Sequence, residues 1–119
     1  MKKFIYIGAL FLGGITLSYA QKVQVKKADK LYDNYNYIDA VETYEKVAQK
    51  GYKSAEIFQK LGNSYYFNAN YNESAKWYGE LFELEPVASD PEYYFRYAQS
   101  LKSVGEYTKA DEYMEKFYQ

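Results

Sequence analysis

Three similar stretches, spaced 34 and 36 residues apart, constrain this chain more than any other feature of its sequence. They begin at Tyr37, Tyr71 and Tyr107, and in each one a small residue follows after three positions, a large apolar residue after seven and another after ten. These offsets place the residues on one face of a helix. A period in this range is typical of a repeat protein.

Each unit contains a second helical pattern ahead of its tyrosine. A small residue stands nine positions earlier, at Ala28, Gly62 and Ala98, and an apolar residue follows it by three. Each unit is therefore expected to be a pair of helices. With capping signals at Asn36, Asn70 and Asp90, the pattern predicts helices at about 22–35, 38–50, 54–68, 71–84, 91–104 and 107–118.

The middle unit resembles the tetratricopeptide repeat in its pattern of bulky and small residues. The matching positions are Phe58, Leu61, Gly62, Tyr65, Tyr71, Ser74, Tyr78 and Pro86. The resemblance extends over nearly all of residues 22–119. It implies an all-α, right-handed α-solenoid of three helix-turn-helix units, at about 22–53, 54–89 and 90–119.

Gly62 lies inside a predicted helix, where glycine costs about 0.8–1.0 kcal/mol relative to alanine. A close approach of the paired helix, on the side that presents Ser74, would explain it. Ala28 with Ala40, and Ala98 with Ala110, would make the same contact in the outer units.

Residues 1–20 have the layout of a secretory signal peptide. Lys2 and Lys3 precede an apolar run of 14 residues, and small residues then lie three and one positions before a cut at Gln21. A retained membrane anchor is the alternative, but a spanning helix needs about 20 apolar residues. We therefore expect export to the periplasm or the outer membrane, and the absence of cysteine excludes both disulfides and lipid attachment to a cysteine.

Composition argues against several functions. Removing the leader would leave 13 Lys and Arg against 16 Asp and Glu, a net charge of −3 without a basic block, which argues against nucleic acid. Without histidine or cysteine, the commonest general base and most zinc ligands are missing. Asp29 and Asp33 share a helix face and could bind a cation, but a solvated acidic patch explains them. We expect no cofactor, no metal, no small-molecule substrate and no enzymatic activity.

The resemblance implies that the first helices of the units line a concave groove that receives a peptide or a partner protein. The side chains there that are free of framework packing form the predicted partner-binding set: Asp29, Tyr32, Asp33, Gln59, Asn63, Tyr66, Phe67, Arg96, Gln99 and Lys102. Tyr66 and Phe67 are the expected aromatic anchors, Asn63 could bond a peptide backbone, and Arg96 could pair with a carboxylate. For any one of these residues, an ordinary solvated position is the alternative.

Two functions remain open from the sequence. The first is a non-enzymatic scaffold of a bacterial envelope, and the second is a glycan or cell-wall binder that stacks sugars on exposed tyrosines. The layout also resembles the N-terminal segment of large OmpA-like outer-membrane proteins of the Bacteroidetes. That resemblance implies a place in an outer-membrane or peptidoglycan-linked assembly, with peptidoglycan binding in another part of the protein.

Overall fold

The computed structural model describes residues 15–119, which form six α-helices and no strand. The helices are α2 (Tyr19–Asp33), α3 (Tyr37–Gln49), α4 (Ala55–Phe67), α5 (Tyr71–Leu84), α6 (Glu92–Ser103) and α7 (Tyr107–Tyr118). The expected six helices are therefore present, and the bounds of α5 and α7 match those expected. Within the described residues, no helix is both long and apolar enough to cross a membrane.

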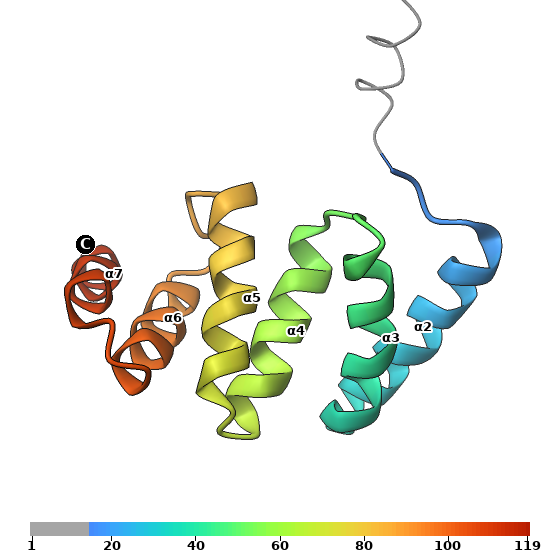
Figure 1. Cartoon of the computed structure of the whole chain (residues 1–119), viewed down its shortest axis with the longest axis horizontal. Coiled ribbons are helices and arrows are strands. Elements are labelled where there is room, and N and C mark those ends of the chain that lie inside the picture. The colour runs from blue at the N-terminus through green and yellow to red at the C-terminus, as the bar shows by residue number, and fades with distance from the viewer. Residues whose placement is uncertain (1–14) are drawn as a thin grey trace, which may run out of the picture.

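The helices follow one another in space as they do along the chain (Figure 1). α2 packs on α3, α4 on α5 and α6 on α7, while α3 with α4 and α5 with α6 join successive pairs. Within residues 15–119, each unit therefore packs mainly on its neighbours, as in a solenoid. The fold is the expected all-α solenoid of three helix-turn-helix units.

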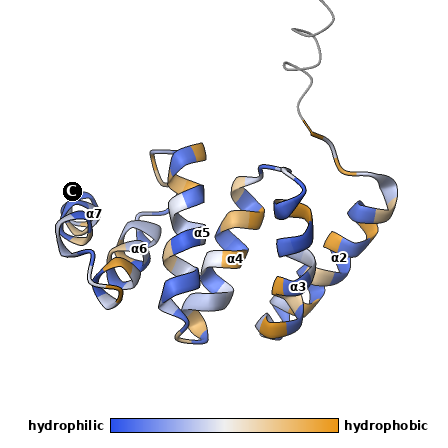
Figure 2. Cartoon of the chain, in the orientation of Figure 1, coloured by the Kyte–Doolittle hydropathy of each residue, from blue (hydrophilic) through white to orange (hydrophobic). Residues whose placement is uncertain are grey.

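The core is built largely from aromatic rings. Tyr44 and Tyr78 are completely buried, and Trp77, Phe82 and Tyr97 are nearly so. Only scattered positions of each helix are coloured hydrophobic in Figure 2, because tyrosine ranks as slightly hydrophilic on that scale. The rings supply the buried area, and their hydroxyl groups need polar partners inside the array.

Side chains before the helices satisfy free backbone N–H groups, as the sequence indicates. Ser54 accepts a hydrogen bond from the N–H of Ile57, and Asn70 accepts one from that of Glu73. Asp90 accepts one from the N–H of Glu92. Asn36 differs, since its amide donates to the Asp39 side chain at 2.9 Å and caps no backbone group.

Three turns inside the units place one residue each in the left-handed region. These residues are Tyr35 (φ 64°), Ala69 (φ 58°) and Gly105 (φ 85°), and they occupy equivalent positions two residues before Tyr37, Tyr71 and Tyr107. Glycine adopts this conformation freely, whereas other residues are strained by it. Only the third unit has glycine there.

α2 begins earlier than expected. It starts at Tyr19, and Ser18 and Gln21 form a capping box at its first turn. The expected cleavage point between Ala20 and Gln21 therefore lies inside the first turn of a helix. Residues 1–14 of the expected leader lie outside the described part of the chain.

The small residue Gly62 accommodates a different neighbour from the one expected. A Cβ added at Gly62 would lie 2.4 Å from two carbons of the Tyr78 ring. Tyr78 lies one turn beyond Ser74 on α5, and Ser74 instead contacts Ser100 of α6 at 2.6 Å. The expectation of a closest contact with Ser74 is thus corrected: glycine at position 62 makes room for an aromatic ring.

Candidate functional site

The first helices of the three units, α2, α4 and α6, meet at the side chain of Asn63. Its amide nitrogen donates to the hydroxyls of Tyr32 at 3.0 Å and Tyr93 at 3.1 Å. Its amide oxygen accepts from the Tyr78 hydroxyl at 2.6 Å and from the Arg96 guanidinium at 2.9 Å. All four hydrogen-bonding positions of this buried amide are therefore occupied.

Arg96 lies beside two aromatic rings and one carboxylate. Its guanidinium carbon is 5.0 Å from the centre of the Phe67 ring and 5.5 Å from that of Tyr93. Its nearest carboxylate, Glu92, is 3.8 Å from Nε. The aromatic faces of Phe67 and Tyr93 and the amide oxygen of Asn63 therefore stabilise the positive charge of Arg96.

Aromatic side chains continue the surface beside Arg96. Tyr37 contacts Tyr32 and Phe67 at ring-centre distances of 5.4 and 5.5 Å, and Tyr66 contacts Phe67 at 5.8 Å. Phe67 is 47% exposed, while Tyr32, Tyr37 and Tyr66 are half-buried. An exposed phenylalanine beside a guanidinium is the kind of surface that anchors a partner.

Burial changes the proton affinity of the phenols in this region. It raises the pKa of Tyr78 well above the usual 10.0, and it raises that of Tyr32 despite the hydrogen bond from Asn63, which acts in the opposite direction. Both hydroxyls therefore stay protonated and neutral at physiological pH. They act as hydrogen-bonding groups, not as charges.

A second polar cluster lies nearer the start of α4. The Asp29 carboxylate accepts from the Tyr44 hydroxyl at 2.5 Å and from the Lys60 ammonium at 2.9 Å, and Lys60 also binds Glu56 at 2.8 Å. Burial lowers the pKa of Lys60, but its two carboxylate hydrogen bonds outweigh this and raise the pKa above its usual value. Asp29 is thus engaged in a network that ties the first unit to the second.

The structure brings together only part of the predicted partner-binding set. Tyr32, Asn63, Phe67 and Arg96 form one connected site, which we call the Asn63 site, with Tyr66 packed beside it. Asp29 belongs to the separate cluster above. The others lie apart: Asp33 is exposed, Gln59 reaches Ser89 at 3.4 Å, and Gln99 and Lys102 line a hollow between α6 and α7.

Sequence reasoning missed Tyr93 as a member of this site. In the repeat register it is equivalent to Ile57, which is buried in the core, so the repeat pattern does not mark it as a partner-binding position. The useful signal was its spacing of three from Arg96, which places both side chains on one helix face.

Asp29 and Asp33, considered above as a possible cation site, belong to no larger group of ligand side chains within residues 15–119. No group of three or more Asp and Glu side chains converges there in a way that could hold an ion. Asp29 is instead paired with Lys60.

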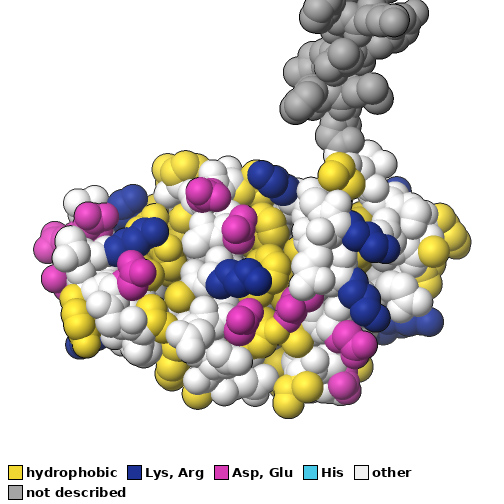
Figure 3. Space-filling model, viewed as in Figure 1, with side chains coloured by type: hydrophobic (Ala, Val, Ile, Leu, Met, Phe, Trp, Pro, Cys, Tyr) yellow, Lys and Arg dark blue, Asp and Glu magenta, His cyan; other side chains and the backbone are white. Residues whose placement is uncertain are grey.

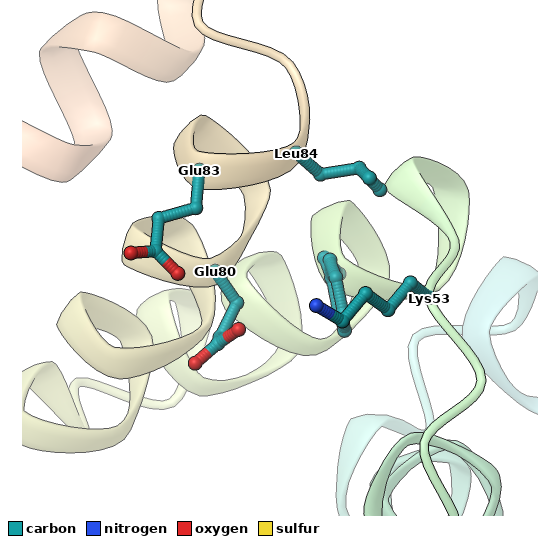
Figure 4. A pocket seen from close by; sticks show the side chains of 5 residues that line it. Lys53, Glu80, Glu83 and Leu84 are labelled. Carbon is teal, nitrogen blue, oxygen red and sulfur yellow. The ribbon is translucent and has the colours of Figure 1, made fainter. Parts of the chain in front are cut away.

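A hollow of about 260 Å³ lies between the start of α4 and the end of α5, apart from the Asn63 site. Figure 4 shows Lys53 extending from the loop before α4 toward Glu80 and Glu83 on α5. Phe58 and Leu84 complete the lining. None of the predicted partner-binding residues takes part.

Comparison of the sequence with known protein families identifies the family to which the chain belongs. The profile of the tetratricopeptide repeat matches residues 55–87 and 91–119, together more than half of the chain. The chain belongs to the tetratricopeptide repeat family. The match contains the second and third units of this tetratricopeptide repeat (TPR) protein, and no curated protein matches its sequence.

Solved structures support the same fold over most of the array. The C-terminal part of a TPR repeat-containing protein from Cytophaga hutchinsonii superposes with a TM-score of 0.66 at 24% identity, over 78% of this chain. Our chain spans only 36% of that structure. PcrH in complex with the chaperone-binding region of PopB gives 0.67 at 16% identity, over 85% of this chain and 81% of PcrH.

The second TPR of Spaghetti (RPAP3) bound to the HSP90 peptide SRMEEVD also gives 0.67, at 15% identity, over 82% of this chain and 89% of that one. At these identities the likeness shows the fold alone. TPR proteins as a family bind peptides or partner proteins.

Proposed function

We propose that this TPR protein is a non-enzymatic scaffold that binds a peptide or partner-protein segment on the face shared by α2, α4 and α6. The observation that carries the proposal is the Asn63 site. A buried amide there holds Arg96 beside the exposed ring of Phe67. Because these contacts position Arg96 before a partner binds, they are expected to lower the entropic cost of association.

The partner contacts follow from what the site leaves available. Phe67 offers an apolar ring, and the edge of Arg96 that does not face Asn63 offers hydrogen-bond donors. Asn63 itself is fully bonded, so it acts by positioning Arg96 and could bond a peptide backbone only by giving up one of its four partners.

A photo-crosslinking amino acid at position 67, introduced in the producing cell, tests this proposal. We expect a discrete protein adduct in the cell envelope. The matched control is position 87, where Val87 is 80% exposed but lies outside the three first helices. Equal adduct formation at both positions, or none at position 67, would contradict a partner site on this face.

We also propose that the protein acts in the bacterial cell envelope, because residues 1–20 have the layout of a secretory leader. An OmpA-like protein of the outer membrane remains the proposed setting for the array. An antibody against residues 21–119, applied to fractionated cells, tests the location. A soluble periplasmic species of about 99 residues indicates a free adaptor, and a larger species in the outer membrane indicates a docking arm. Detection only in the cytoplasm would reject export.

Glycan binding is the second candidate, favoured by the exposed rings of Tyr35 and Tyr107, which are 79% and 63% accessible. Titration with soluble peptidoglycan fragments, followed by tyrosine fluorescence, separates it from the scaffold. A saturable response would support the glycan function, and no response leaves the scaffold alone.

A further inference from the structure

A hollow on a different part of the surface lies between α3 and the turn that joins α4 to α5. It measures about 370 Å³ and is lined by Ile38, Val41, Tyr65, Asn68 and Asn70. None of the lining side chains is charged. In Figure 3, hydrophobic side chains reach the surface along the lower edge of the molecule, where Figure 1 places this turn, and acidic side chains lie beside them.

The equivalent positions of the other two units show whether the fold requires the apolar residues of this hollow. Ile38 is 73% exposed, and the equivalent positions in the other units are Asn72 and Thr108. Val41 is equivalent to Ala75 and Asp111. The helix pair therefore folds with polar or smaller residues at both positions, and packing within the unit does not require Ile38.

Tyr35, in the turn before α3, adds an exposed aromatic ring at a position whose left-handed backbone it shares with Ala69 and Gly105. The ring is 79% exposed. A non-glycine residue in this region is strained. Strain of this kind is common at functional sites. Tyr35 lies three residues before Ile38, at the same end of α3.

The rim of the hollow carries two side-chain amides. Asn68 is exposed, and its side chain makes no hydrogen bond within residues 15–119. The Asn70 oxygen accepts from the N–H of Glu73 at 3.4 Å, and its NH₂ group has no partner within the same residues. Free amide groups beside an apolar floor can pair with the backbone of a bound segment.

We propose that this hollow receives an uncharged apolar side chain of a partner protein, whose backbone amides pair with Asn68 and Asn70. No lining side chain carries a charge that could pair with a charged group, whereas covering the exposed aliphatic floor with an apolar side chain is favourable. The aliphatic floor of Ile38 and Val41 suits leucine or phenylalanine better than a sugar, which stacks best on an aromatic face. This second docking surface is distinct from the Asn63 site, and its use does not depend on binding there.

The test uses a minimal probe of this chemistry, N-acetyl-leucine methylamide, with N-acetyl-glutamate methylamide as the charged counterpart. The probes are titrated into the purified nitrogen-15-labelled protein. We expect the leucine probe to shift the side-chain amide signals of Asn68 and Asn70 and the backbone signals of residues 38–41 in a saturable manner. The glutamate probe should shift them much less.

Ile38→Asn, which introduces the residue of the second unit, should weaken the leucine probe at least about fivefold. Val87→Asn is the matched control, because it also removes an exposed apolar side chain but lies outside the hollow, and it should leave binding unchanged. Undiminished binding to the Ile38→Asn variant would overturn the proposal, as would no response up to the solubility limit.

Two further outcomes would assign the hollow to another occupant and reject the proposal. A stronger shift of the same signals by N-acetylglucosamine would indicate a glycan site. Shifts of these signals on dilution of the protein, without any probe, would indicate a second copy of the chain.

Discussion

At the scale of single residues, two adjacent positions on α4 determine how the two helices of the second unit fit together. Gly62 leaves space for the Tyr78 ring, and Asn63 takes the hydroxyl of the same ring. These adjacent positions on α4 therefore fix one tyrosine of α5 by shape and by hydrogen bonding. Each role leads to a prediction about stability.

Replacing Gly62 by leucine should destabilise the protein by about 1–3 kcal/mol, because the new side chain would overlap the Tyr78 ring. Urea unfolding followed by circular dichroism measures the change. Asn72→Leu is the control, since it adds the same side chain at an exposed position of α5. A Gly62→Leu protein as stable as the wild type would refute the assigned contact.

Replacing Asn63 by alanine should cost about 2–3 kcal/mol, because the buried Tyr78 hydroxyl and the Arg96 guanidinium would lose their shared acceptor. The same unfolding experiment measures it. Gln59→Ala on the same helix removes only a 3.4 Å contact with Ser89 and should change stability by less than about 0.5 kcal/mol. Similar losses in the two variants would argue against the four-bond arrangement.

At the scale of the elements, the turns within the units carry the main conformational strain. All three place a residue in the left-handed region at the same position, and only Gly105 is suited to it. The helices on either side set this geometry, because the second helix of each pair must return along the first.

Ala69→Gly should therefore stabilise the protein by about 0.5–1 kcal/mol, since the strain removed exceeds the added chain entropy. Ala75→Gly, in the interior of α5, should instead destabilise the protein by about 1 kcal/mol. Thermal unfolding of both variants checks the pair. Destabilisation by both substitutions would show that the turn at Ala69 is not strained.

At the scale of the whole molecule, tyrosine hydroxyls join helices within the units and between them, and they make the array sensitive to alkaline pH. Tyr44 reaches Asp29, Tyr65 reaches Glu45 and Tyr78 reaches Asn63. Burial, followed by the carboxylate partner where there is one, raises the pKa of all three phenols above 10.0. The protonated forms are thus favoured in the folded state.

A group whose pKa is raised on folding contributes its full stability below the unfolded pKa and loses it as the pH rises further. We therefore expect the melting temperature to be nearly constant up to about pH 9 and to fall steeply above about pH 10. Circular dichroism melts across this range measure the effect. Tyr78→Phe should reduce the alkaline slope, while Tyr118→Phe, at a 76% exposed position, should not. Equal slopes in both variants would contradict the assignment to buried phenols.

The sequence by itself determined the period, the six helices, most of their caps and the small residues at the helix crossings. These features depend on local chemistry and on spacing along one helix, which a sequence displays directly. Only the tertiary structure decided how side chains from different units combine. In the structure, all four hydrogen-bonding positions of Asn63 are occupied, and Tyr93 is one of its partners. Gly62 faces the ring of Tyr78, whereas the sequence predicted a contact with Ser74. Such contacts depend on the rotation of each helix about its axis and on the packing of rings between units, and a repeat pattern specifies neither closely enough.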